Sequence, residues 1–269
     1  MLPYEFVGDW SGQLVTTSIH AGHDLRPEVA DLMSLDESKR RREEDPYTDA
    51  IGSLMPARLL VHRSRFEADL NRSRDMAIYA GPDYCWGFDV WNTAGLPADV
   101  ATRSLQYWDA FYADLAVRLD ELAERGPFVI LDVHSYNHRR PGPDQPDEPW
   151  ENNPELDLGT GKVDREQFTP VIDALRGAMT AQGFDVRDEV KFFPKQLSNW
   201  VHHCYPGVGC VMTLEFKKTF MDEWTGIPDA HHLDLLARAM TQTIEPLEAA
   251  LAAMTPVASS QDSPDQLAS

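Results

Sequence analysis

The chain has 269 residues, 42% hydrophobic and 25% charged, and its 44 Asp and Glu against 24 Lys and Arg give a net charge of −20 at pH 7. This composition is that of a globular protein with a full core and excludes a disordered chain. So negative a charge argues against duplex nucleic acid and anionic membranes as partners, because both attract basic proteins. It leaves room for a small anionic substrate, since a few arginines or a metal ion can reverse the field inside a cleft.

The cysteines and the N-terminus indicate the compartment. Cys85, Cys204 and Cys210 form an odd set without a CxxC pair, so a disulfide framework is not expected. The first residues lack a basic region and a long apolar run, and no stretch approaches the ~18 apolar residues of a membrane span. We therefore expect a cytoplasmic protein. The sequence does not predict an oligomeric state.

Short apolar runs rich in β-branched residues predict strands in four places. These are residues 14–19, 58–62, 128–133 and 208–216. Apolar residues at spacings of three and four predict helices over 105–122 and 233–251, and Pro246 is expected to kink or restart the second of them. Strands that alternate with helices predict an α/β fold, in which a mostly parallel mixed sheet has helices on both faces.

The remaining segments predict the domain organisation. Residues 137–161 contain five prolines among Asp, Glu and Asn, which predicts a long loop of a kind that is usually either functional or disordered. The last residues, 255–269, are small and polar and are expected to be disordered. No repeat or composition break marks a second domain, so we expect a single domain over residues 1–254.

Histidines cluster at the ends of two predicted strands. His20 and His23 follow the first strand, and His134 and His138 follow the strand at 128–133. The carboxyl ends of strands in an α/β sheet line one crevice, so both clusters are expected to face it. Imidazole is the commonest side-chain ligand of zinc, and a catalytic zinc needs three protein ligands. His20, His134 and one further residue would form that set, although loop histidines bound to backbone or water are the alternative.

Two further features suggest a hydrolytic site. Glu215 lies in an otherwise apolar strand, where a carboxylate is costly unless it is paired or acts as a general base. The alternative is a solvent-facing glutamate on an edge strand. An arginine-rich segment, residues 63–74, suggests capture of a substrate carboxylate, whereas a solvated charge run is the alternative.

These motifs resemble two related groups of enzymes. The runs His134-Ser135-Tyr136, Asn71-Arg72 and Thr213-Leu214-Glu215-Phe216 resemble motifs of zinc carboxypeptidases, and they occur in the same order. Residues 19–23, 44–49 and 64–72 are more similar still to the N-formylglutamate amidohydrolase family. The resemblance spans about residues 15–220.

The resemblance implies a three-layer, zinc-carboxypeptidase-like fold, one zinc ion per chain and an activated water that hydrolyses an amide. The substrate it implies is N-formyl-L-glutamate, which yields formate and glutamate. His20 and His134 would bind the metal, and Glu215 would act as the general base. Asn71 and Arg72 would hold the substrate, with Arg65 as a second candidate for its carboxylate.

One position departs from the carboxypeptidase pattern and leaves the third ligand open. Those enzymes use a glutamate three residues after the first histidine, and this chain has His23 there. Either His23 completes a three-histidine site, or Glu44 or Asp45 supplies the ligand. The cleavage of another N-acyl amino acid or of a C-terminal residue, and a non-catalytic carboxylate-binding protein, are the alternative functions.

Overall fold

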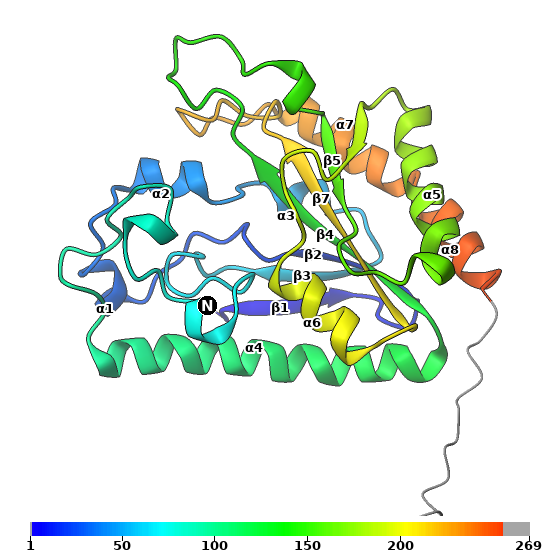
Figure 1. Cartoon of the computed structure of the whole chain (residues 1–269), viewed down its shortest axis with the longest axis horizontal. Helices are drawn as coiled ribbons and strands as arrows, with labels where there is room; N and C mark the ends of the chain where they lie inside the picture. Colours follow the sequence, from blue (N-terminus) through cyan, green and yellow to red (C-terminus); the bar gives the residue numbers. More distant parts are fainter. Residues whose placement is uncertain (1, 255–269) are drawn as a thin grey trace, which may run out of the picture.

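A computed structural model describes residues 2–254 and contains a single seven-stranded sheet in the order β1-β3-β2-β4-β7-β5-β6 (Figure 1). The predicted tail, 255–269, lies outside the described residues. The four predicted strands are present as β2, β3, β4 and β7. The strands are β1 (Tyr4–Gly8), β2 (Leu14–Ser18), β3 (Ala57–Val61), β4 (Phe128–Tyr136), β5 (Leu156–Gly159), β6 (Val186–Asp188) and β7 (Gly209–Lys217).

The sheet is mixed and mostly parallel, as predicted. The centre of the sheet, β3-β2-β4-β7, is parallel throughout, and β5 and β6 are parallel to each other. β1 pairs antiparallel with β3, and β5 pairs antiparallel with β7. The prediction that residues 137–161 form only a loop was wrong, because this segment contains β5. Four residues are too few to display a strand period, and pairing with β7 is what orders them.

Helices cover both faces of the sheet, which confirms the predicted three-layer α/β class (Figure 1). One face packs against α4 and α6, and the other against α3, α5, α7 and α8. Three short 3-10 turns lie at Arg74–Met76, Pro82–Tyr84 and Trp150–Asn152. The helices are α1 (Pro27–Ala30), α2 (Glu37–Glu43), α3 (Thr48–Ile51), α4 (Ala98–Arg125), α5 (Arg165–Ala181), α6 (Gln196–Cys204), α7 (Ala230–Thr241) and α8 (Ile244–Ala252).

The C-terminal helical pattern forms two helices. α7 ends at Thr241 and α8 begins at Ile244, with Pro246 in its first turn. A proline is tolerated there because the first amides of a helix have no partner within it. Of the two outcomes expected for Pro246, the structure shows the restart.

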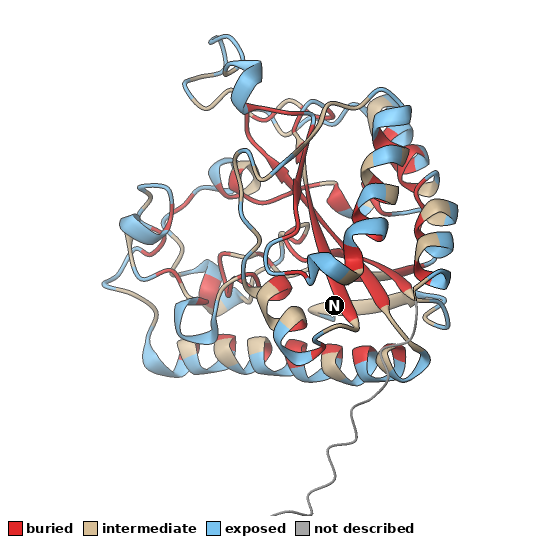
Figure 2. Cartoon of the chain, turned by 45° about the vertical axis from the view of Figure 1, so that its right-hand side comes forward, coloured by how far each residue is buried: buried red, intermediate tan, exposed pale blue. Residues whose placement is uncertain are grey.

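The central strand β4 is buried along its whole length (Figure 2), and its alternate residues pack into two separate cores. Val129, Leu131 and Val133 pack toward α5, α7 and α8, whereas Phe128 and Ile130 pack toward α4 and α6. Because side chains alternate along a strand, Asp132 and His134 point to the α4 and α6 side. The fold thus places polar groups at the carboxyl end of an apolar strand. No helix in the described part of the chain is long and apolar enough to cross a membrane.

Candidate metal centre and active site

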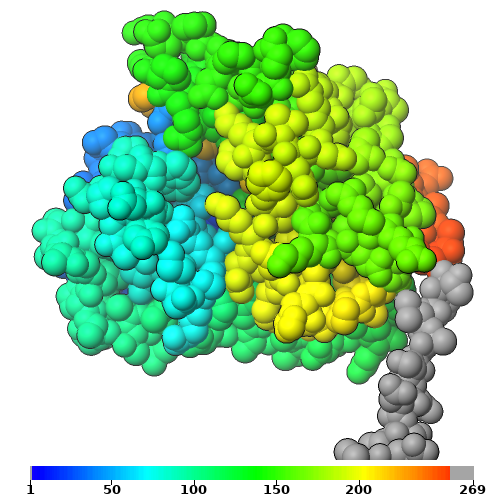
Figure 3. Space-filling view, in the orientation of Figure 1, coloured from blue at the N-terminus to red at the C-terminus, as the bar shows by residue number. Residues whose placement is uncertain are grey.

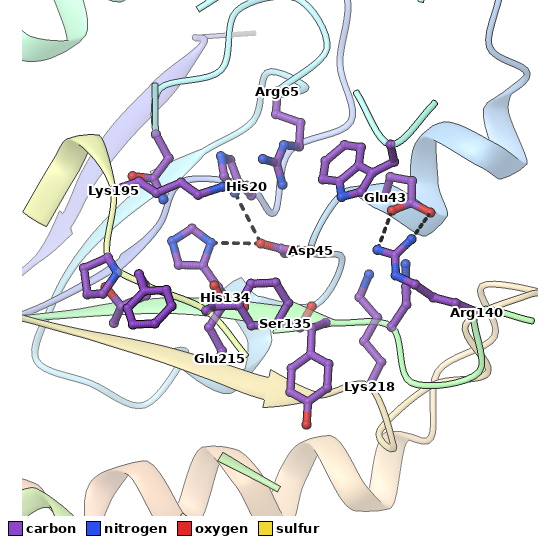
Figure 4. A pocket seen from close by; sticks show the side chains of 18 residues that line it. His20, Glu43, Asp45, Arg65, His134, Ser135, Arg140, Lys195, Glu215 and Lys218 are labelled. Carbon is purple, nitrogen blue, oxygen red and sulfur yellow. Dashed lines mark hydrogen bonds and ion pairs between the residues drawn. The ribbon is translucent and has the colours of Figure 1, made fainter. Parts of the chain in front are cut away.

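Three buried side chains meet at the carboxyl end of the central strands. His20 follows β2, His134 lies in β4, and Asp45 lies in the turn between α2 and α3. One nitrogen or oxygen atom from each lies within 4.8 Å of those of the other two (Figure 4). The backbone N–H of Asp45 donates to the carbonyl of His20 at 3.0 Å, which fixes this turn against the end of β2.

Both histidines are oriented by a second carboxylate on their far side. Asp69 Oδ1 lies 2.7 Å from Nε2 of His20, and Asp132 Oδ2 lies 2.9 Å from Nε2 of His134. The Nδ1 atoms of the two rings then face Asp45, whose Oδ2 lies 3.3 Å from His20 and 2.9 Å from His134. Outer carboxylates of this kind fix the ring orientation of metal-binding histidines.

The polar contacts of these groups fit a bound cation. Nδ1 of His20 is buried and has no hydrogen-bond partner within residues 2–254. Burial by itself lowers the pKa of His134, but Asp132 and Asp45 outweigh it and raise the pKa well above its ordinary value. Burial likewise raises the pKa of Asp45, yet the hydrogen bond with His134 and the attraction of His134 and His20 lower it further than burial raises it. Two imidazoles and a carboxylate that attract positive charge are a donor set suited to a divalent metal.

Glu215 stands beside this group on the neighbouring strand. It is the register partner of His134 in the β4–β7 pair, so the two side chains lie on the same face of the sheet. Burial, with added repulsion from Asp45 and Asp132 and opposed by His134, raises the pKa of the Glu215 carboxyl to about 8. A carboxyl with such a pKa can accept and return a proton near neutral pH.

The structure does not bring His23 to this group. Nδ1 of His23 lies 2.5 Å from Glu44 Oε2, and its Nε2 lies 2.9 Å from an Arg40 nitrogen. Glu44 also accepts hydrogen bonds from Ser64 and Arg40. Among the three candidates for the third ligand, Asp45 is therefore the one that lies with His20 and His134. The prediction of a three-histidine cluster fails because Glu44 and Arg40 occupy both nitrogens of His23.

A pocket of about 90 Å³ opens over the His20–Asp45–His134 group. Figure 3 shows a hollow between the segment near residue 80 and the segment near residue 195, and Figure 4 shows the side chains of the pocket. Of the predicted substrate-binding residues, Arg65 and Asn71 line it, but Arg72 does not. Nη2 of Arg72 instead donates to the carbonyl of Tyr84 at 2.8 Å, and its Nε lies 3.5 Å from Asp69.

Sequence reasoning missed three cations in the pocket wall, Arg140, Lys195 and Lys218. Lys218 is buried, and its Nζ donates to the carbonyls of Arg42 at 2.8 Å and of Glu44 at 2.7 Å. Burial lowers the pKa of this lysine. The signal in the sequence was the position of Lys218 directly after an apolar strand. A charged side chain that is buried there is costly unless it is paired or hydrogen-bonded.

A sequence profile described as N-formylglutamate amidohydrolase matches residues 12–220. The chain belongs to the N-formylglutamate amidohydrolase family. This confirms the resemblance drawn from the motifs, and the matched range contains every residue of the pocket. The sequence has no significant match among curated proteins.

Two of the matched solved structures share the fold at low sequence identity. The N-formylglutamate amidohydrolase from Ralstonia eutropha JMP134 has a TM-score of 0.72 at 17% identity, over 93% of this chain and 97% of that chain. The gene product Atu2144 from Agrobacterium tumefaciens has a TM-score of 0.65 at 14% identity, over 91% of this chain and 96% of that one. A putative carboxypeptidase A from Shewanella denitrificans OS-217 has a TM-score of 0.41 at 13% identity, over 91% of this chain and 60% of that chain.

Proposed function

We propose that this N-formylglutamate amidohydrolase family member is a zinc-dependent enzyme that hydrolyses N-formyl-L-glutamate to formate and glutamate. The observation that carries the proposal is the buried His20–Asp45–His134 group with Glu215 in register beside His134. Two oriented histidines, one carboxylate and an adjacent general base are the components that metal-assisted hydrolysis requires.

His20, Asp45 and His134 would hold the metal ion, with Asp69 and Asp132 orienting the two rings. A zinc ion bound there would lower the pKa of water and polarise the formyl carbonyl. Thr17 supports this arrangement from β2, since its hydroxyl donates to Asp132 at 2.6 Å. This bond fixes the carboxylate that in turn fixes His134.

Glu215 would move the proton in the reaction. Because its pKa is raised toward neutral pH, the carboxyl could take a proton from water and return it to the leaving nitrogen. A bound cation would lower that pKa and so favour the carboxylate form. The position of Glu215 at the pocket wall, on the same face as His134, gives it access to a bound substrate.

The cations of the pocket favour a small anionic substrate. Arg65, Arg140, Lys195 and Lys218 line the pocket beside Glu43, Asp45 and Glu215, in a chain whose net charge is −20. Cations gathered in a cleft of an acidic protein can attract a small anion there. N-formyl-glutamate carries two carboxylates, and Arg65 and Asn71 are the predicted substrate residues that reach the pocket.

Formate release from N-formyl-L-glutamate by zinc-loaded protein tests this proposal. We expect equal amounts of formate and glutamate, and we expect His134→Ala to lose the activity because it removes a metal ligand. His203→Ala is the matched control, since His203 is exposed in α6 and lies outside the pocket.

Two results would overturn the proposal. One is a zinc-loaded wild type that releases no formate from this substrate. The other is a His134→Ala variant that is as active as the wild type. Activity confined to other N-acyl amino acids or to peptides would support the alternative hydrolases, and carboxylate binding without turnover would support a binding protein.

A further inference from the structure

The cations of the pocket differ in how far they are already paired. Arg65 contacts Asp69 at 2.7 Å, and Arg140 contacts Glu43 at 3.0 Å. Lys218 donates to two backbone carbonyls. Lys195 also lines the pocket, but it forms no ion pair or side-chain hydrogen bond with any residue in the 2–254 range. Its ammonium is therefore the pocket cation that is free to bind a ligand.

Lys195 lies next to Asn71 at the start of α6. The carbonyl of Asn71 accepts a hydrogen bond from Gln196 N at 3.4 Å, and its Oδ1 accepts one from Leu197 N at 3.2 Å. Because Oδ1 is used as an acceptor, the atom of Asn71 that remains for a ligand is Nδ2, a donor. Figure 4 shows the Lys195 side chain extending toward His20.

The electrostatic surroundings of Lys195 favour an anion at this point. Burial and repulsion from Arg65 lower the pKa of Lys195, with Asp69 and Glu215 opposing the shift. An anion near the ammonium would offset that repulsion, since an opposite charge stabilises the charged form. A carboxylate also has enough acceptor sites to bind both Lys195 Nζ and Asn71 Nδ2.

We propose that Lys195 and Asn71 together bind one carboxylate of the substrate. The identity of the substrate rests on the proposed function, whereas the binding site rests on the pocket itself. In this arrangement Lys195 supplies the positive charge expected from Arg72, whose guanidinium contacts Tyr84 and Asp69 outside the pocket lining.

Three substrates and two variants test the proposal. The substrates are N-formyl-L-glutamate and its two monoamides, N-formyl-L-glutamine and N-formyl-L-isoglutamine, each of which lacks one carboxylate. The variants are Lys195→Met and Lys195→Arg. Lys162→Met is the matched control, because Lys162 is an exposed lysine that does not line the pocket.

We expect Lys195→Met to raise KM for N-formyl-L-glutamate by about 10- to 100-fold, the value of a charge-assisted hydrogen bond, with a smaller change in kcat. Lys195→Arg should restore most of the affinity. The increase in KM caused by Lys195→Met should be smaller for the one monoamide that lacks the carboxylate bound by Lys195. An equal loss for all three substrates, or a fall in kcat at unchanged KM, would overturn the proposal.

A binding measurement separates this proposal from the proposed function. If the wild type hydrolyses none of the three substrates, calorimetric titration with glutarate still probes the carboxylate site. We then expect weaker glutarate binding in Lys195→Met than in the wild type and in Lys162→Met. Equal binding by all three proteins, or no binding by the wild type, would refute the carboxylate site.

Discussion

His134 and Glu215 are register partners on the adjacent parallel strands β4 and β7, so one strand pair positions both a metal-binding candidate and a proton-transfer candidate. Nine consecutive residue pairs connect these strands, from Phe128 with Gly209 to Tyr136 with Lys217. The relative position of the two side chains is therefore set by the centre of the sheet rather than by a mobile loop. Rigid elements hold functional groups more precisely than loops do.

The Glu215→Gln variant tests proton transfer. The amide keeps the shape of the side chain but cannot accept a proton, so we expect kcat to fall by about 10²- to 10⁴-fold. Metal content should be unchanged, because Glu215 is not part of the His20–Asp45–His134 group. Formate release and elemental mass spectrometry measure the two quantities. Glu166→Gln, an exposed change in α5, is the control, and unchanged turnover in Glu215→Gln would remove Glu215 from the mechanism.

Asp45→Asn and His23→Gln together test the third metal ligand. Asp45 supplies the carboxylate between the two histidines. Asp45→Asn should therefore weaken metal binding by at least the roughly 10- to 100-fold that follows when a residue hydrogen-bonded to a metal ligand is replaced. His23→Gln should keep the metal, because His23 contacts Glu44 and Arg40 instead. Competition with a chelator measures both affinities. A large loss of metal affinity in His23→Gln with little change in Asp45→Asn would show instead that His23 is the third ligand.

Lys218 is a positioning residue for Asp45. Its ammonium donates to the carbonyls of Arg42 and Glu44, which lie three residues and one residue before Asp45 in the chain. We expect Lys218→Met to lower metal affinity by about 10- to 100-fold, which is the typical loss when a residue that orients a metal ligand is replaced. Thermal unfolding of the metal-free protein serves as a second readout. A fall in stability of the metal-free protein at unchanged metal affinity would show that Lys218 supports only the fold.

His202 predicts a pH dependence of stability that is separate from the active site. It lies in the last turn of α6, and its Nε2 accepts a hydrogen bond from Val211 N of β7 at 3.0 Å. Burial lowers the pKa of His202 to about 4, whereas an unfolded histidine has a pKa of about 6.5. The folded state therefore favours the neutral ring. The contribution of His202 to the free energy of unfolding is therefore complete above pH ~6.5 and is lost as the pH falls toward ~4.

Unfolding by urea at several pH values measures this effect. We expect the free energy of unfolding of the wild type, relative to His202→Gln, to fall by up to about 3 kcal/mol across that interval. Glutamine can accept the same hydrogen bond without titrating, so it isolates the charge. Parallel stability curves for the two proteins would show that His202 does not titrate in this way.

Much of the site could be predicted because its chemistry lies at the ends of long strands. His20, His134 and Glu215 each follow or lie in a run of apolar residues, and parallel strands bring such ends together. Short elements were harder to find. β5 has four residues, and its position depends on β7, which is distant in the sequence.

The third ligand and the substrate residues depended on contacts that no local pattern reveals. Asp45 and Glu44 are adjacent, and the choice between them depends on where Lys218 and the carbonyl of His20 hold their backbone. Asn71 and Arg72 are likewise adjacent, but one lines the pocket and the other points to Tyr84. Lys195 directly precedes α6, whose first turn is held against Asn71 by the backbone N–H groups of Gln196 and Leu197, a contact between segments that are distant in the sequence.

Anomalous diffraction from crystals grown with zinc is the most direct test of the metal centre. We expect one strong peak per chain, with bonds of about 2.0–2.2 Å to nitrogens of His20 and His134 and to a carboxylate oxygen of Asp45. Asp69 and Asp132 should remain on the far nitrogens of the two rings. No peak at this position, or a peak held by His23 and Glu44 instead, would contradict the central assignment of the metal site.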